Sequence, residues 1–226
     1  MNKIIIFDAS TLITFAMNGL FEEFRNLKKI FNGKFIITSQ IKREIIDKPL
    51  TIKRFELEAL RLKQFLDEKI LELPSSLNID EKEILEETNL IMDKSNTLFN
   101  EKDKKIHLID LGEASALALS KILTKQNLEN VLAVDERTTR MLCEKPEDLK
   151  KIFQKKLHTK IDVKKEDYKF FKGFQFIRSA ELVYVIYKKK LTNLKNPLVL
   201  DALLYAVKFK GCSISEDEIQ EIKKIG

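Results

Sequence analysis

The chain has 226 residues, of which 44% are hydrophobic, so it can bury a sizeable core, and its composition argues against a disordered chain. Its 41 lysines and arginines exceed its 35 acids and give a formal net charge of +6. This excess favours a phosphate-bearing partner, and it is equally common on ordinary lysine-rich surfaces. Cys143 and Cys212 lie too far apart in the sequence for a zinc ribbon or a disulfide framework, and no apolar run reaches the roughly 20 residues of a membrane span. We therefore expect one cytoplasmic domain over residues 1–226, and Asp8 interrupts the only run that resembles a signal peptide.

The first 50 residues predict two strands, each followed by a helix. Residues 3–7 are β-branched or aromatic, which is typical of a strand buried on both faces of a parallel sheet. Ser10 or Thr11 suits the N-cap of the next helix. Residues 34–38 predict a second strand, and Ser39 is a natural cap for the short helix after it.

The pattern changes in the middle of the chain and then returns. Long helical periodicity crowded with charge begins at about residue 51, and we interpret residues 50–105 as a helical insertion. A helix over 110–123 and a strand over 130–134 follow. This alternation of strands and helices predicts an α/β fold with right-handed crossovers.

The last third of the chain predicts mainly helices. A short strand at 174–177 precedes helices over 179–191 and 198–210. A final helix begins with the capping-box pattern of Ser215 and Glu218.

Acidic residues stand where predicted strands end or predicted helices begin. Asp8 and Asp135 each follow a buried strand, Glu44 lies on the helix after the second strand, and Asp110 and Glu113 open a helix. Because the carboxyl ends of parallel strands line the ligand crevice of an open sheet, we expect these acids to converge. Clustered carboxylates stay ionised only beside a cation, and ligands that are all oxygen suit Mg²⁺ or Mn²⁺.

Each acid also has a purely structural interpretation. Asp8 and Asp135 suit helix N-termini, Asp110 and Glu113 fit a capping box, and Glu44 by itself is typical of a solvated helix face. The residues taken singly leave both interpretations open.

Four segments in chain order, FDASTLI, ITSQIKREI, LGEASALALS and AVDERTTRML, resemble the four acidic motifs of PIN-domain proteins. The third resembles the subgroup with a Gly-Glu-Ala motif. The resemblance covers residues 1–48 and 106–145 and, more loosely, the C-terminal helical pair, but not the middle insertion. It implies a three-layer α/β/α fold with a mainly parallel central sheet, and a divalent-metal-dependent endoribonuclease that cleaves single-stranded RNA.

By position, the resemblance assigns four catalytic acids: Asp8, Glu44, Glu113 and Asp135. Asp8, Glu113 and Asp135 are also the expected ligands of Mg²⁺ or Mn²⁺. Asp110 either replaces or assists Glu113 as the third ligand. Ser10 is expected to support a ligand or hold Asp8 by a hydrogen bond, and Glu136 is a further contributor.

Positive charge is expected to guide the RNA to these acids. Arg137, Arg140 and Lys121 flank the third and fourth motifs and are the candidate nucleic-acid contacts. The lysine run at 150–165 is more typical of a solvated helical face, because it lacks regularly interleaved aromatic residues. The resemblance to toxin members further implies a small inhibitory protein partner and a homodimer, with no membrane contact.

Two other classes of function remain open at this point. A phosphatase of the haloacid-dehalogenase type would use Asp8 as its nucleophile, although Ser10 stands where such enzymes carry a second aspartate. A PIN-like fold that serves as a non-catalytic scaffold or regulatory module would use the helical insertion for contacts.

Overall fold

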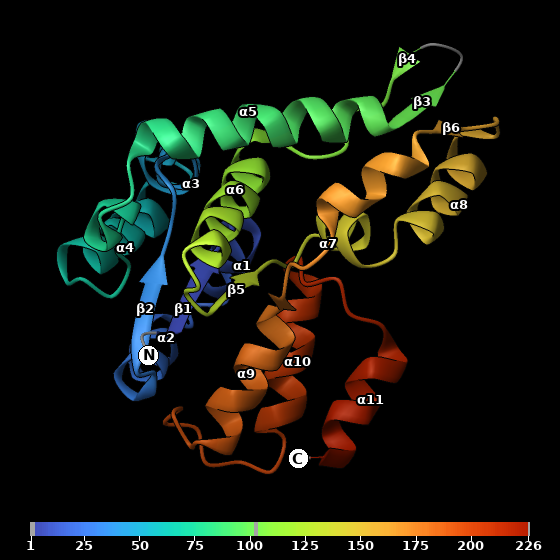
Figure 1. Cartoon of the computed structure of the whole chain (residues 1–226). Helices are drawn as coiled ribbons and strands as arrows, with labels where there is room; N and C mark the ends of the chain where they lie inside the picture. Colours follow the sequence, from blue (N-terminus) through green and yellow to red (C-terminus); the bar gives the residue numbers. More distant parts are fainter. Residues whose placement is uncertain (1–2, 102–103, 226) are drawn as a thin grey trace.

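The computed structural model describes residues 3–101 and 104–225 (Figure 1). Its strands are β1 (Lys3–Phe7), β2 (Gly33–Ile36), β3 (Phe99–Glu101), β4 (Lys104–Lys105), β5 (Asn130–Ala133), β6 (Asp162–Val163) and β7 (Phe176–Ile177). Its α-helices are α1 (Ala9–Met17), α2 (Phe21–Ile30), α3 (Ser39–Lys42), α4 (Glu56–Asp67), α5 (Glu81–Leu98), α6 (Leu111–Lys125), α7 (Arg137–Glu144), α8 (Pro146–Leu157), α9 (Ser179–Lys188), α10 (Val199–Phe209) and α11 (Glu216–Ile225). A π-helical turn, η1 (Arg43–Asp47), and the 3₁₀ turns η2 (Pro49–Thr51), η3 (Pro74–Leu77) and η4 (Lys165–Phe171) complete the elements. Within the described ranges, no helix has the length and apolar character needed to cross a bilayer.

A four-stranded parallel sheet in the order β2-β1-β5-β7 forms the centre of the molecule. The β-branched run of β1 pairs on both sides, so that Ile5 lies opposite Phe35 in β2 and Val131 in β5. The predicted α/β class and parallel sheet are confirmed. The chain leaves β1 toward β2 on one side and later returns to β5 on the other, which makes the carboxyl ends of β1 and β5 the topological switch point of the sheet.

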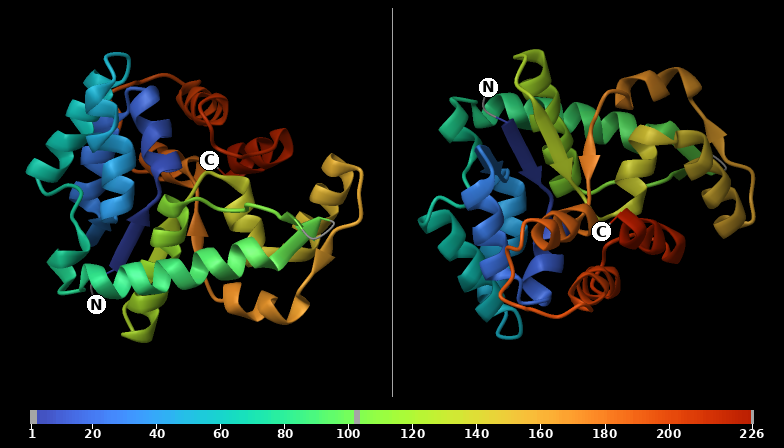
Figure 2. Two further views of the ribbon diagram at one scale, coloured as in Figure 1. Left: turned by 90° about the horizontal axis from the view of Figure 1, so that it is seen from above. Right: turned by 90° about the horizontal axis from the view of Figure 1, so that it is seen from below.

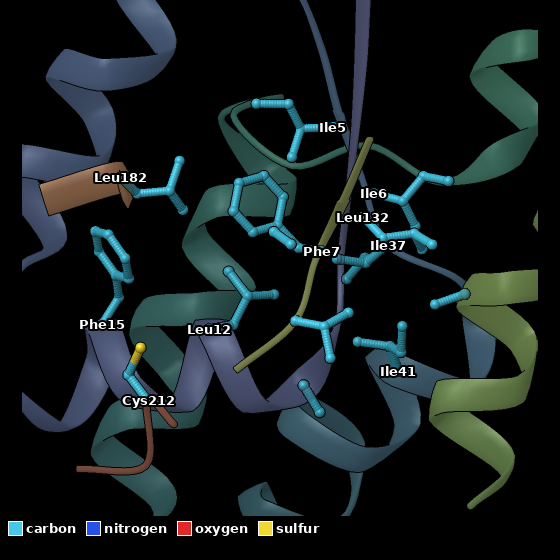
Figure 3. Packing of buried hydrophobic residues seen from close by; sticks show 14 of the residues in the cluster. Ile5, Ile6, Phe7, Leu12, Phe15, Ile37, Ile41, Leu132, Leu182 and Cys212 are labelled. Atoms are coloured by element: carbon cyan, nitrogen blue, oxygen red, sulfur yellow. The ribbon is translucent and has the colours of Figure 1, made fainter. Parts of the chain in front are cut away.

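Helices cover both faces of this sheet. Helix α6 packs against β1 and β5 on one face with α5 outside it, and α1 packs with α2 and α9 on the other (Figure 1). In Figure 3, Phe7 and Leu12 lie on one side of β1 and Ile6 and Ile41 lie on the opposite side, as the alternation of side chains along a strand requires. This arrangement is compatible with three α/β/α layers.

Helix α4, at the start of the predicted insertion, shares the main core. Phe65 of α4 stacks on Phe24 of α2 with ring centroids 5.2 Å apart, and Phe24 in turn meets Phe7 and Phe35 edge-on. Such aromatic contacts contribute roughly 0.5–1.5 kcal/mol each beyond the area they bury. Helix α4 is therefore part of the domain that carries the sheet.

A second, antiparallel sheet of order β4-β3-β6 lies at the far end of α5, away from the main sheet (Figure 2). The strand predicted at 174–177 is shorter in the structure, where β7 contains only Phe176 and Ile177. The capping box predicted at Ser215 and Glu218 is present, with the Glu218 carboxylate accepting the Ser215 N–H at 2.8 Å.

Candidate active site

Asp8 occupies the end of β1 and caps α1. Its Oδ2 atom accepts the Ser10 N–H at 3.0 Å and the Ser10 hydroxyl at 2.5 Å. The prediction that Ser10 or Thr11 is the N-cap is therefore wrong. Asp8 is the N-cap of α1, and Ser10 donates hydrogen bonds to its carboxylate. Asp8 is only 3% exposed. Burial is the main cause that raises the pKa of its carboxyl to about 6, the bonds from Ser10 lower it, and the charge of Asp110 adds to the rise.

Glu44 reaches the same region from a distorted helix. Thr38, instead of the predicted Ser39, caps α3, and the helix then widens into the π-helical turn η1, which contains Glu44. Single π-helical turns occur frequently at functional sites. Burial raises the pKa of Glu44 to about 7, and the charges of Asp110 and Asp8 contribute to this rise. Glu44 Oε2 and Asp110 Oδ1 both lie within 3.4 Å of the position that a Cβ atom of Gly112 would occupy, so these two carboxylates are neighbours.

Asp110 and Glu113 form a reciprocal cap at the start of α6. The Asp110 carboxylate accepts the Glu113 N–H at 2.9 Å, and the Glu113 carboxylate accepts the Asp110 N–H at 2.8 Å. Asp110 is exposed and Glu113 is 9% exposed. Burial raises the pKa of Glu113 to about 8, its bond from Asp110 lowers it, and the charges of Asp110 and Asp8 raise it further. The capping box and the acidic cluster are thus the same feature, and both candidates for the third ligand belong to it.

Gly112 brings two of these acids together, a role that the sequence interpretation missed. A Cβ atom at this position would lie 2.7 Å from Glu44 Oε2 and 3.4 Å from Asp110 Oδ1. Any larger residue would displace the Glu44 carboxylate, because non-bonded carbon atoms do not approach oxygen so closely. The glycine of the Gly-Glu-Ala motif was the signal available in the sequence.

Asp135 follows β5, the strand next to β1, and its carboxylate is held by Ser179. It is fully buried, and its two carboxylate oxygens accept the Ser179 N–H at 2.7 Å and the Ser179 hydroxyl at 2.6 Å. Asp135 therefore stabilises the N-terminus of α9, where unpaired N–H groups attract a negative charge. The Asp135 N–H donates to Ser10 Oγ at 3.1 Å, and the same hydroxyl donates to Asp8, so Ser10 links the two strand ends. Ser179, which holds the Asp135 carboxylate, left no signal in the sequence.

The remaining predicted residues lie around α7 and on α6. Glu136 caps α7 by accepting the Thr139 N–H at 2.8 Å. Lys121 pairs with Glu87 of α5 at 2.8 Å and lies 3.6 Å from the centre of the Phe170 ring. It stands eight residues beyond Glu113, which is about 12 Å along the helix, so it joins α5 to α6 and does not line the acidic cluster.

A pocket of about 320 Å³ opens beside the acids. Glu44, Asp110 and Gly112 line it, and Arg43 and Lys48 add positive charge to its lining. An anionic substrate could approach the acids from this side through these cations. Arg137 and Arg140 instead line a different and larger groove.

The donor chemistry of the cluster fits a hard divalent cation. Its four side chains are carboxylates, and three of them have raised pKa values because they are buried and lie near like charges. A bound cation would relieve this repulsion. Among residues 3–101 and 104–225, however, no three His, Cys, Asp or Glu side chains are drawn together closely enough to hold a metal ion as they stand.

Comparisons with known proteins add no relative to this description. No protein-family model matches the chain, and neither the curated proteins nor the solved structures yield a significant match.

Proposed function

We propose that the cluster of Asp8, Glu44, Asp110 and Glu113 is the site of a divalent-metal-dependent endoribonuclease that hydrolyses single-stranded RNA. The observation that carries this proposal is the placement of these carboxylates at the switch point of a parallel sheet, where Gly112 leaves room for Glu44 beside Asp110. Burial raises the pKa values of Asp8, Glu44 and Glu113, and the charge of Asp110 adds to each rise. Asp8, Asp110 and Glu113 also cap helices, and titratable groups whose pKa values are strongly perturbed occur frequently at functional sites.

The proposal includes a PIN-like fold. Its support is the order of the four motif segments along the chain together with the parallel sheet, whose strand ends carry Asp8 and Asp135. The helices on both sides of that sheet are consistent with the three layers such a fold requires.

The residues of the cluster would divide the work as follows. Asp8, Glu44, Asp110 and Glu113 would hold Mg²⁺ or Mn²⁺. The bound ion would supply an activated water and neutralise the charge that develops on the phosphate. Ser10 fixes the orientation of Asp8 through two hydrogen bonds, and the Asp110 N–H fixes that of Glu113. Arg43 and Lys48 would attract the phosphates of the RNA to the pocket.

An incubation with end-labelled single-stranded RNA tests this proposal. We expect discrete products in Mn²⁺ or Mg²⁺, none with chelator and none with Asp8→Asn. Asp93→Asn, which makes the same change at an exposed position of α5, serves as the matched control and should cleave like the wild type. Intact RNA with a folded wild-type protein in both metals would contradict the proposal.

A non-catalytic PIN-like scaffold is the second candidate. The observation that favours it is Asp135, both of whose carboxylate oxygens accept hydrogen bonds from Ser179. Titration of Mn²⁺ followed by electron paramagnetic resonance separates the two. The nuclease requires Mn²⁺ binding that Asp8→Asn weakens, whereas a scaffold predicts no such binding.

A further inference from the structure

A groove of about 830 Å³ lies between α7, α8 and the segment 212–218. We call it the α7–α8 groove. Its lining includes six cationic side chains: Arg137, Arg140, Lys145, Lys151, Arg178 and Lys208. Only three carboxylates share the lining: Glu144, Asp148 and Glu218. The groove is therefore positively charged well beyond what the acids in its walls neutralise.

Three of the cations have no acidic partner. Within the described residues, no carboxylate oxygen lies within ion-pair distance of Arg137, Arg140 or Lys145. Arg137 Nε–H donates to the sulfur of Met141 at 3.2 Å. Arg140 donates to the Ser213 carbonyl at 3.1 Å, but its Nε–H is buried without a partner among the described groups. Guanidinium groups without an acidic partner keep donors available for an anionic ligand in the groove.

The shape and charge of the groove indicate what it would bind. Its volume lies within the range of about 300–1,000 Å³ that is usual for ligand sites, which suits a short extended segment and not a folded partner. Unpaired arginines favour phosphates, because the guanidinium group donates to two oxygens at once. Apolar side chains of Met141, Ile152 and Ile214 in the same lining offer contact surface between the charges.

The groove and the acidic cluster lie on opposite sides of α7. With about 100° between successive residues, Arg137, Arg140 and Met141 fall on one face of this helix and Thr139 falls on the other. Thr139 is buried, and its hydroxyl makes no hydrogen bond within the described residues. It lies close enough to Glu113 to lower the pKa of that carboxyl, so the cluster is on the side of this second face. About one helix diameter, roughly 10 Å, thus separates the two sites, and a single strand that crosses the start of α7 would reach both.

We propose that the α7–α8 groove binds the phosphodiester backbone of single-stranded nucleic acid, through Arg137, Arg140 and Lys145, as an anchoring site separate from the acidic cluster. The choice of a nucleic acid over an acidic peptide rests on the proposed function, since the neighbouring acids would act on such a strand.

Fluorescence anisotropy with a labelled oligouridine of about 12 nucleotides, in chelator so that no cleavage occurs, tests this proposal. Each contact to a single strand contributes about 0.7 to the slope of log K against log salt, so Arg137→Gln with Lys145→Gln should lower the slope by about 1.4. At about 0.1 M salt this corresponds to binding about 25-fold weaker than that of the wild type. Lys155→Gln with Lys156→Gln removes the same charge from exposed positions of α8 outside the groove, and should change the affinity less than about 2-fold because salt screens distant charges.

Three results would overturn the proposal. Equal weakening by the two double variants would assign binding to the overall positive charge. An absence of binding at about 0.05 M salt would refute a phosphate site outright, because electrostatic binding is strongest at low salt. Equal competition by oligoglutamate of the same length would assign the groove to acidic peptides. Comparable binding of oligodeoxyuridine would support recognition of the backbone.

The outcome separates this proposal from the nuclease proposal. If the wild type and Asp8→Asn bind the RNA alike but neither cleaves it with metal present, the proposal for the groove is supported and the nuclease proposal is refuted. If the double variant Arg137→Gln with Lys145→Gln cleaves RNA with an unchanged kcat/KM, the nuclease proposal is supported and the proposal for the groove is refuted.

Discussion

Replacement of Glu113 by Gln should make the stability of the metal-free protein less sensitive to pH. Burial raises the pKa of Glu113 from 4.5 to about 8, so the folded protein holds a proton on this group that the unfolded chain releases. Between these two pH values the folded state binds more protons than the unfolded state, and the free energy of unfolding therefore falls as the pH rises. At about 1.4 kcal/mol for each unit, the Glu113 contribution falls by about 3 kcal/mol between about pH 4.5 and 7.

The Gln variant removes the ionisation and keeps the shape. Its amide oxygen can still accept the Asp110 N–H, which lies 2.8 Å from the Glu113 carboxylate. Urea unfolding followed by circular dichroism, in chelator and at several pH values, measures the free energy of unfolding of both proteins. We expect the wild type to lose about 3 kcal/mol more than Glu113→Gln over this range. Asp8 and Glu44 titrate in both proteins, so the difference isolates Glu113.

Two further measurements sharpen this test. Glu221→Gln, at an exposed position of α11, should keep the wild-type slope. Saturating Mn²⁺ should flatten the slope of the wild type, because a cation stabilises the ionised acids of the folded state. Equal slopes for the wild type and Glu113→Gln would show that this carboxyl ionises as easily in the folded protein as in the unfolded chain, and the burial argument would be wrong.

Three other changes have expected outcomes. Asp135→Asn should lower the free energy of unfolding by about 2 kcal/mol in urea titrations, because an amide replaces the buried carboxylate that accepts both bonds from Ser179. Adding Ser179→Ala should lower the free energy of unfolding little further. If the effects of the two substitutions simply add, the pairing of these residues is contradicted. Gly112→Ala should weaken Mn²⁺ binding about 10-fold in paramagnetic resonance titrations while the protein stays folded, since its Cβ would displace Glu44; unchanged affinity would show that the Glu44 carboxylate is not needed. Glu216→Gln should tighten oligouridine binding about 5-fold at about 0.1 M salt, because it frees Lys208 of the groove from its ion pair. Unchanged affinity in anisotropy titrations would contradict a phosphate contact at Lys208.

Local sequence patterns predicted much of the secondary structure. The strands at residues 3–7 and before Asp135 can be predicted from a short window of sequence, because parallel strands buried on both faces are continuously hydrophobic. The caps at Asp110 and at Ser215 involve partners three residues apart, so their spacing is visible in the chain. Where two polar residues competed for one cap, as at Asp8 and Ser10, the sequence alone did not decide between them.

The candidate site could be predicted only in part. Asp8 and the Asp110–Glu113 cap were expected together because strand ends and helix starts of a parallel sheet meet at one edge. The π-helical turn that carries Glu44 was not visible in the sequence, and in the structure it packs against α4 and α1. The ion pair of Lys121 with Glu87 was not visible either, because it depends on how α5 and α6 pack.

The sequence by itself determined which residues form strands and helices and which acids stand at their ends, because these are short-range properties of the chain. The tertiary structure decided which acids meet. Asp135 follows its strand just as Asp8 does, yet a donor 44 residues further along the chain captures its carboxylate. Glu44 and Asp110, 66 residues apart, approach each other only because Gly112 leaves room between their helices. Hydrogen-bond partners that are distant in sequence are fixed by packing, and the local pattern of residues carries no record of them.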